Sequence, residues 1–156
     1  MAKTSAGVLP YRRRGGALEV LLVHPGGPLW ARKDLGAWSI AKGEYEPRED
    51  PFAAALREFI EETGFRPEGE FIALQPRKQP SGKVIQAWAV ETDWDPSTLC
   101  CNTFEMEWPR GSGRRCAFPE VDRAEWFTVE DAARRIVPGQ RGFLEELQGR
   151  LEATKR

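Results

Sequence analysis

The segment 43–65, GEYEPREDPFAAALREFIEETGF, constrains the fold of this chain more than any other stretch. Its second half predicts a helix, because Asp50 can cap the first turn and Pro51 suits the first helical position. Gly64 suits the left-handed residue that ends many helices. Apolar residues recur between these limits at offsets of four and three, so one face of the helix points toward a core. We therefore expect a loop that leads into a capped, amphipathic helix.

Three carboxylates lie within two turns of this predicted helix. Glu58, Glu61 and Glu62 stand at spacings that place their side chains on one side of the axis, where they repel one another. Arg57 precedes Glu61 by four positions and offsets part of that repulsion. Hard cations such as Mg²⁺ bind through carboxylates together with substrate phosphates, so a divalent metal is the first hypothesis. For the three acids alone, a solvated face would be the better explanation.

The spacing of the whole segment favours the metal. It combines a glycine, an acid five residues later, and a helix with arginine and paired glutamates, at Gly43, Glu49, Arg57-Glu58-Phe59, Glu61-Glu62 and Gly64-Phe65. A pattern of this length recurs by chance on the order of once in 10⁸ starting positions. It resembles the signature of the Nudix hydrolases at every defining position. The resemblance implies an α/β fold, the Nudix-type α/β/α sandwich with a mixed β-sheet between helices.

The resemblance also implies the metal ligands. In that family the helix acids hold divalent metals with help from a backbone carbonyl near the glycine of the motif. Carried over to this chain, Glu58 and Glu62 are the expected ligands, and Gly43 or its neighbour Lys42 supplies the carbonyl. The expected cofactor is Mg²⁺, with Mn²⁺ as the alternative.

Further roles follow from the same resemblance. Glu49 and Arg57 are expected to form a salt bridge that holds the loop against the helix, and Glu61 is either a ligand or a bridge to Arg57. Relatives often recruit another acid six positions before a tryptophan, and Glu120 stands six before Trp126. Glu120 is therefore a candidate extra ligand or general base. The alternative is an ordinary surface acid in an acidic loop.

The chemistry suits a phosphoanhydride, whose negative oxygens repel a nucleophile until a metal neutralises them and lowers the pKa of water. We expect a metal-dependent pyrophosphohydrolase of a nucleoside diphosphate linked to another group: a dinucleoside polyphosphate, an NTP, ADP-ribose or a nucleotide sugar. One alternative is a catalytically weak, nucleotide-sensing Nudix module, although no helix acid is lost here. Another is divergent chemistry, such as an isomerase, on the same fold.

Substrate recognition has weaker signals. Lys42, Arg32 and Lys33 precede the motif and are candidates to meet phosphates, although ordinary surface charge explains them equally well. Candidates for stacking on a base are among Trp30, Trp38, Trp88 and Trp108, although most of the six tryptophans are expected in the core. His24 is interpreted as structural.

Two family cues compete over the substrate. Pro80 lies where some ADP-ribose-cleaving relatives carry a proline, although residues 79–82 also suit an ordinary hairpin turn. The segment WSIAKGE, in contrast, is similar to the lysine-containing entry of diadenosine-polyphosphate hydrolases. It departs from them at Ala41, where a proline is usual. The choice of substrate therefore stays open.

Composition bounds the remaining possibilities. A chain of 156 residues suits one domain, expected over 1–156, and a net charge of −1 gives no basic bias toward a nucleic-acid polymer. No stretch is apolar enough to span a membrane, and the first residues lack the pattern of a signal peptide. Three cysteines without CxxC spacing indicate free thiols and a cytoplasmic location. Resemblance alone suggests a homodimer.

The remaining pattern predicts short strands and two further helices. Turn signals and alternating apolar residues predict strands at Ser5–Tyr11, Leu18–His24, Trp38–Ile40, Phe71–Gln75, Val84–Val90, Phe104–Trp108 and Glu125–Phe127. Thr128 can cap a helix that runs through about Ile136. Apolar residues from Phe143 to Leu151 predict a terminal amphipathic helix.

Overall fold

The computed structural model describes residues 4–154, so the predicted domain limits at 1 and 156 lie outside the described residues. Within this range, seven strands form the central sheet: β1 (Thr4–Arg14), β2 (Ala17–Pro25), β3 (Ala41–Glu44), β4 (Phe71–Ala73), β5 (Arg77–Lys78), β6 (Val84–Glu91) and β9 (Val121–Thr128). The strand order is β4-β6-β1-β2-β9, with β3 paired to β1 and β5 paired to β6. Because β1 runs parallel to β6 and antiparallel to β2 and β3, the sheet is mixed.

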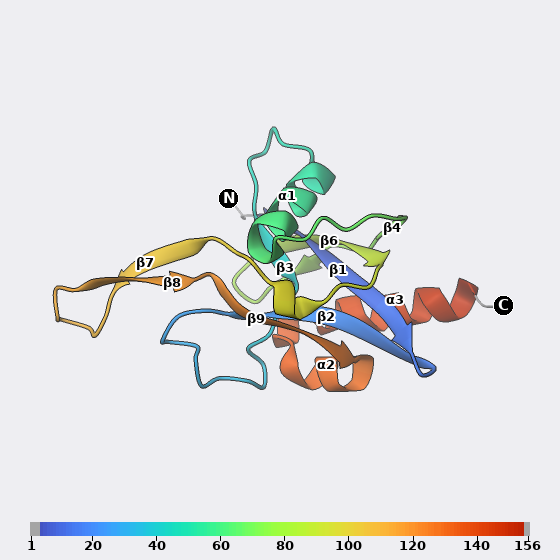
Figure 1. The fold of residues 1–156 in the computed structure, drawn as a ribbon. Coiled ribbons are helices and arrows are strands. Elements are labelled where there is room, and N and C mark those ends of the chain that lie inside the picture. Colours follow the sequence, from blue (N-terminus) through green and yellow to red (C-terminus); the bar gives the residue numbers. More distant parts are fainter. Residues whose placement is uncertain (1–3, 155–156) are drawn as a thin grey trace.

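Helices cover both faces of this sheet (Figure 1). Helix α1 (Pro51–Thr63) packs on one face, and α2 (Val129–Arg135) and α3 (Arg141–Thr154) pack on the other. Two single-turn 3₁₀ helices, η1 (Pro96–Thr98) and η2 (Pro138–Gln140), lie in the connections. The expected α/β/α sandwich is confirmed.

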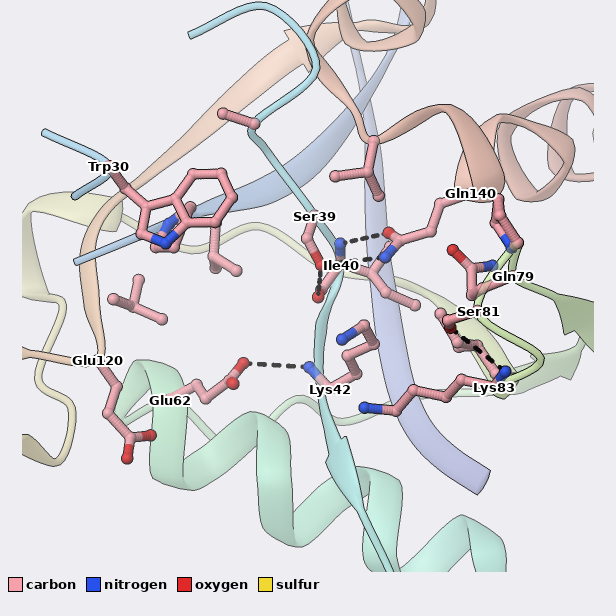
Figure 2. A pocket seen from close by; sticks show the side chains of 17 residues that line it. Trp30, Ser39, Ile40, Lys42, Glu62, Gln79, Ser81, Lys83, Glu120 and Gln140 are labelled. Atoms are coloured by element: carbon pink, nitrogen blue, oxygen red, sulfur yellow. Dashed lines mark hydrogen bonds between the residues drawn. The ribbon is translucent and has the colours of Figure 1, made fainter. Parts of the chain in front are cut away.

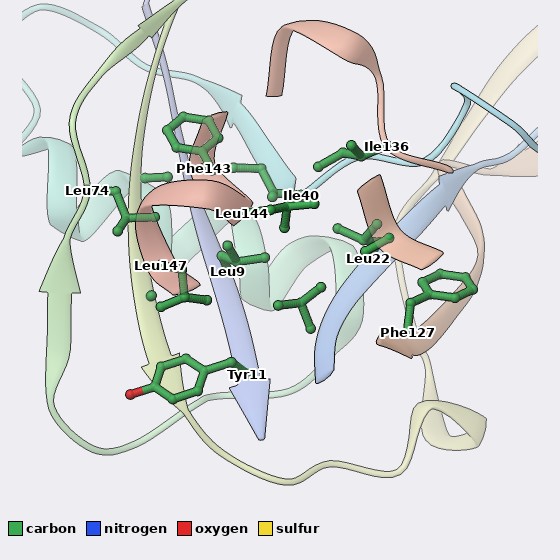
Figure 3. Packing of buried hydrophobic residues seen from close by; sticks show 14 of the residues in the cluster. Leu9, Tyr11, Leu22, Ile40, Leu74, Phe127, Ile136, Phe143, Leu144 and Leu147 are labelled. Atoms are coloured by element: carbon green, nitrogen blue, oxygen red, sulfur yellow. The ribbon is translucent and has the colours of Figure 1, made fainter. Parts of the chain in front are cut away.

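Side chains of the central strand alternate between two hydrophobic cores. Val8 packs with Phe59 of α1 on one face, whereas Leu9 packs with Phe143 and Leu147 of α3 on the other (Figure 3). Successive residues of a strand point to opposite faces, so a strand covered on both sides is buried along its length and largely apolar. Residues 5–11 of β1 are all buried, as this arrangement requires.

The predicted helix of the motif begins and ends where its capping residues indicated. The Asp50 carboxylate accepts a hydrogen bond of 3.0 Å from the amide of Ala53, and Pro51 occupies the first helical position. Gly64 adopts a φ of 78° and donates its amide to the Ile60 carbonyl at 2.7 Å. The local sequence was sufficient to predict both ends of α1, because each capping residue satisfies backbone groups of its own helix.

The strand predicted at Trp38–Ile40 is wrong. Trp38 and Ser39 each form one isolated bridge, and the strand β3 begins later, at Ala41 within the motif. The Ile40 amide donates to the side-chain oxygen of Gln140 at 3.0 Å, so a side chain distant in sequence replaces the expected strand partner. A local pattern contains no information about that partner.

A second, two-stranded sheet projects from the body (Figure 1). It consists of β7 (Thr103–Glu107) and β8 (Arg115–Pro119), and we call residues 103–119 the arm. β7 lies close to the predicted strand at Phe104–Trp108, whereas β8 was not predicted. β9 also begins four residues before the predicted start at Glu125.

The thiols match the expectation from the sequence. Cys100, Cys101 and Cys116 are all free cysteines. No helix within residues 4–154 combines the length and the apolar character needed to cross a membrane.

The cap of α1 provides a test of how much local structure stabilises this helix. Asp50→Ala should lower the free energy of unfolding by about 1 kcal/mol, because one amide of the first turn loses its acceptor. The melting temperature should then fall by roughly 2–4 °C. Asp50→Ser keeps an acceptor and is the matched control. Equal melting temperatures for the alanine variant and wild type, measured by circular dichroism, would contradict the assignment.

Candidate active site

A cavity of about 550 Å³ opens beside the C-terminal half of α1 (Figure 2). Its walls come from β3, the loop after β2, the β5–β6 hairpin, the segment before β9 and the η2 turn. Polar and aromatic residues line it at Trp30, Ser39, Lys42, Glu62, Gln79, Ser81, Lys83, Glu120 and Gln140. The tertiary structure therefore joins part of the motif to segments far from it in sequence.

Gly43 lies directly against the carboxylate of Glu58. A β-carbon built at residue 43 would clash with the carboxylate atoms, so any other residue here would displace Glu58. The register of β3 on β1 places Gly43 opposite Ala6, and α1 packs on both strands. This glycine is required for close approach of the loop to the helix. These two parts of the motif therefore lie in direct contact.

Glu62 lies deepest among the helix acids. Its carboxylate accepts a hydrogen bond of 3.1 Å from the backbone amide of Lys42 and lines the cavity. Burial raises the pKa of Glu62 to about 8; the charges of Glu58 and Glu120 act in the same direction, while Lys42 opposes them. Burial also raises the pKa of Glu58. Partly buried carboxylates that repel one another do not form a solvated surface face.

Arg57 connects the loop to the helix, as expected. Its guanidinium forms an ion pair with Glu49 at 3.1 Å and donates to both carboxylate oxygens. The same group approaches Glu58 at 2.9 Å and Glu61 at 3.5 Å. Glu49 also accepts from the Glu46 amide at 3.1 Å, which closes the loop before the helix. Of the two roles considered for Glu61, the structure displays the bridge to Arg57.

Glu120 lies in the cavity wall between β8 and β9. Its backbone is held on both sides, because its amide donates to the Asn102 carbonyl and its carbonyl accepts from the Gly26 amide, each at 2.9 Å. The Glu120 side chain extends below Trp30 near Glu62 (Figure 2). Its charge contributes to the raised pKa of both Glu58 and Glu62. Glu120 is exposed at the cavity wall, and its role as extra ligand or general base stays a prediction.

Two lysines face the acids across the cavity (Figure 2). Burial lowers the pKa of Lys42, and the charge of neighbouring Lys83 lowers it further. Lys83 also forms an ion pair of 3.0 Å with Glu44. Two ammonium groups held close together create a strong positive potential, which suits a polyphosphate.

The basic residues upstream of the motif, which were predicted to bind phosphates, differ in their position relative to the cavity. Lys42 lines the cavity, but Arg32 and Lys33 do not. The loop turns at Lys33, whose amide donates to the Trp30 carbonyl at 2.9 Å, and its ammonium lies 4.9 Å from the centre of the Trp30 ring. That turn directs Trp30 rather than the two cations toward the cavity. Arg32 and Lys33 are thus not brought to the site.

The tryptophans also separate by environment. Trp30 is 39% exposed and lines the cavity, so it is the one candidate for base stacking that the structure brings to the site among residues 4–154. Trp38 is fully buried, and Trp88 packs on Phe52. Trp108 is exposed on the arm.

His24 has the structural role that its sequence position suggested. The ring is fully buried, with Nδ1 2.8 Å from an Asp122 carboxylate oxygen and Nε2 2.6 Å from the Lys33 carbonyl. These contacts fasten the loop that carries Trp30 to the start of β9. Both ring nitrogens are used, so His24 has no free nitrogen for a substrate.

Sequence reasoning missed several residues of the cavity. Lys83 enters because β6 pairs in parallel with β1, and Gln140 enters from η2, where its side chain bonds Ile40 and Ser39. Neither residue has a local motif that could have identified it. The segment 79–82 was interpreted as a hairpin turn, and the structure makes it both that turn and part of the cavity wall.

The donor atoms fit a hard divalent cation. Carboxylate oxygens of Glu58 and Glu62, together with backbone carbonyls near Gly43, are the ligand type that Mg²⁺ prefers. The space left by the missing β-carbon of Gly43 holds the Glu58 carboxylate at the inner edge of the loop. Within the described part of the chain, however, no three histidine, cysteine or acidic side chains are gathered close enough to coordinate one ion. The metal-ligand roles of these residues stay predictions.

Comparison with known proteins shows the class of this chain. The model of the NUDIX domain matches residues 1–147. An RNA pyrophosphohydrolase from Roseobacter denitrificans is 29% identical, over 85% of this chain and 86% of that protein.

Solved structures show the same fold. The Ap4A hydrolase of C. elegans, in a binary complex, has a TM-score of 0.66 at 21% identity and covers 96% of this chain and 98% of its own. The NUDIX domain of Shewanella oneidensis NrtR, complexed with ADP ribose, has a TM-score of 0.63 at 15% identity, covering 97% and 89%.

The fold and site thus define a Nudix hydrolase, an enzyme that acts on phosphoanhydrides. The chain belongs to the Nudix family, as its motif predicted.

The buried acid makes a prediction about stability. In the unfolded chain Glu62 loses its proton near pH 4.5, and in the folded chain near pH 8. Between these values the folded state holds the extra proton, so the free energy of unfolding should decrease as pH rises. Glu62→Gln removes that dependence and, with chelator present at about pH 9, should melt roughly 5 °C above wild type.

Glu61→Gln is the matched control, because the Glu61 side chain is 43% exposed. Melting temperatures measured at several pH values would settle the assignment. If Glu62→Gln keeps the pH dependence of wild type, another group is responsible for it.

Proposed function

We propose that this Nudix hydrolase is a metal-dependent pyrophosphohydrolase that cleaves a nucleoside diphosphate linked to another group. The observation that carries the proposal is one cavity in which Lys42 and Lys83 face Glu62 and Glu120, with Trp30 at the rim. Cations bind the phosphates of a nucleoside polyphosphate, an aromatic ring stacks on its base, and acids serve its hydrolysis.

Each part of the cavity has a role in binding. Lys42 and Lys83 hold the phosphate oxygens, and the exposed ring of Trp30 stacks on a base. A volume of about 550 Å³ suits one nucleotide, so the group on the other side of the diphosphate extends out of the cavity. This geometry favours a substrate with two parts, such as a dinucleoside polyphosphate. The likeness to the C. elegans Ap4A hydrolase supports that choice.

The acids have different roles in the proposed reaction. Glu58 and Glu62 would hold Mg²⁺ or Mn²⁺, with a carbonyl from Gly43 or Lys42. A bound ion would neutralise phosphate charge and acidify water. Glu120 lines the same cavity near Glu62 (Figure 2) and takes the proton of the attacking water. Arg57 holds Glu49, Glu58 and Glu61 and so positions the loop without touching the substrate.

The direct test of the function is hydrolysis of a substrate panel. The purified chain should be incubated with Mg²⁺ or Mn²⁺ and with NTPs, ADP-ribose, nucleotide sugars and dinucleoside polyphosphates, and the products identified by mass. Glu62→Gln should reduce hydrolysis to background, and Glu120→Gln should reduce kcat by about 10²–10⁴-fold.

A wild-type rate in Glu120→Gln would exclude Glu120 as the base. Cleavage of no member by wild type would contradict the function. Tight binding without product release would instead identify the chain as a nucleotide-sensing module.

Lys83 gives a separate prediction about phosphate binding. Lys83→Ala should raise KM by roughly 10–100-fold with little change in kcat, because a charge-assisted hydrogen bond to the polyphosphate is lost. Lys83→Arg keeps the charge and should recover part of the affinity. Lys78→Ala on the neighbouring strand β5 is the matched control, because Lys78 is exposed and does not line the cavity. Equal KM values for both alanine variants would remove Lys83 from the site.

A further inference from the structure

The arm begins at the rim of the cavity. Its second strand ends at Pro119, and the next residue, Glu120, lines the cavity beside Trp30. From this point β7 and β8 extend away from the body as a sheet with no strand partner in the central sheet (Figure 1). A molecule whose end lies in the cavity would therefore meet the arm as it leaves.

Contacts at the base hold the arm in this position. The Phe104 ring lies over Gly27, where a β-carbon would come within 2.8 Å of the ring. Across the arm, the rings of Phe104 and Phe118 are 6.1 Å apart, and the amide of Glu120 bonds the Asn102 carbonyl. The base of the arm is thus packed against the same loop that presents Trp30.

The end of the arm concentrates positive charge. Residues 103–119 contain two glutamates and three arginines. Glu105 forms an ion pair with Arg115 at 3.6 Å, and Glu107 accepts from the Gly113 amide at 3.2 Å. Arg110 and Arg114 are exposed and form no side-chain hydrogen bond or ion pair with residues 4–154. Two cations at this end are therefore available for an anionic partner.

An aromatic ring stands next to these cations. Trp108 is 36% exposed, and its amide donates to the Arg114 carbonyl at 2.9 Å. The turn is closed by a second bond of 3.0 Å from the Ser112 amide to the Pro109 carbonyl. Exposed aromatic rings beside arginines are the features with which proteins bind single-stranded nucleic acid, by stacking on bases and pairing with phosphates.

The length of the arm fits such a strand. Arg114 lies six positions before Glu120. At about 3.3 Å per residue of β-strand, Arg114 lies roughly 20 Å from the cavity. Stacked nucleotides rise about 3.4 Å each, so about six of them would span this distance.

We propose that the arm binds a single-stranded polynucleotide whose 5′-polyphosphate end lies in the cavity. The inference rests on the proposed pyrophosphohydrolase function, and it replaces the dinucleoside polyphosphate by a polynucleotide whose first nucleotide carries the terminal phosphates. It departs from the expectation of no nucleic-acid polymer, which relied on a net charge of −1 for the whole chain. That sum conceals a local excess of arginine at the end of the arm.

The test compares a long substrate with a short one. Substrates are a 5′-triphosphorylated RNA of about eight nucleotides, which reaches past the span estimated for the arm, and diadenosine tetraphosphate. The double variant Arg110→Ala/Arg114→Ala should lower kcat/KM for the RNA about tenfold and reduce the salt slope of its binding by about 1.4. Trp108→Ala should weaken RNA binding about tenfold. The ratio of RNA to dinucleotide hydrolysis should fall in both variants.

The β1–β2 hairpin provides the matched control. Arg13 and Arg14 are exposed on a hairpin at the opposite end of the molecule (Figure 1), so Arg13→Ala/Arg14→Ala removes the same charge far from the arm. An equal effect of both double variants on the RNA would overturn the proposal. An equal effect of the arm variant on both substrates would overturn it too, because the arm would then support the cavity.

Two further measurements separate the remaining explanations. Fluorescence anisotropy with the labelled RNA reports binding even when wild type cleaves nothing, so failure of the proposed function and failure of the arm are distinguished. Binding of a 5′-hydroxyl RNA of the same length should also weaken in the arm variants. Analytical ultracentrifugation checks a second copy as the occupant. If the arm variants lose self-association but bind RNA as wild type does, the partner of the arm is a second copy of this chain and not a polynucleotide.

Discussion

The close approach of Gly43 to the carboxylate of Glu58 is the contact on which the site depends. It requires β3 to pair with β1 in one register and α1 to pack on both strands. Small residues of the helix, Ala54 and Ala55, are fully buried at this interface and let the helix lie close to the sheet. Loop, strand and helix thus hold the Glu58 carboxylate against the loop of the motif.

This arrangement brings like charges together at a cost to stability. Burial raises the pKa of Glu62, and burial together with Lys83 lowers the pKa of Lys42, so the folded state disfavours both charges. Arg57 relieves part of the repulsion in the acidic cluster through its pairs with Glu49, Glu58 and Glu61. The remaining charges suit ligands that bring opposite charge: a cation beside the acids and a polyphosphate beside the lysines.

Features with local causes could be predicted from the sequence. The caps at Asp50 and Gly64 satisfy backbone groups of their own helix, and the Arg57–Glu49 pair lies within one motif. Features with distant partners could not. The strand predicted at Trp38–Ile40 is wrong because the amide of Ile40 bonds a side chain from η2. Arg32 and Lys33, which were predicted to meet phosphates, do not line the cavity.

The sequence by itself determined the family, the motif helix and the acids that it carries, because short-range spacing defines all three. Tertiary structure alone decided the cavity. Parallel pairing of β1 with β6 brings Lys83 beside Lys42, and the loop held by His24 brings Trp30 to the rim near Glu120. These residues meet because strands and loops distant in sequence pack together, and no local pattern of side chains encodes which strands will be neighbours.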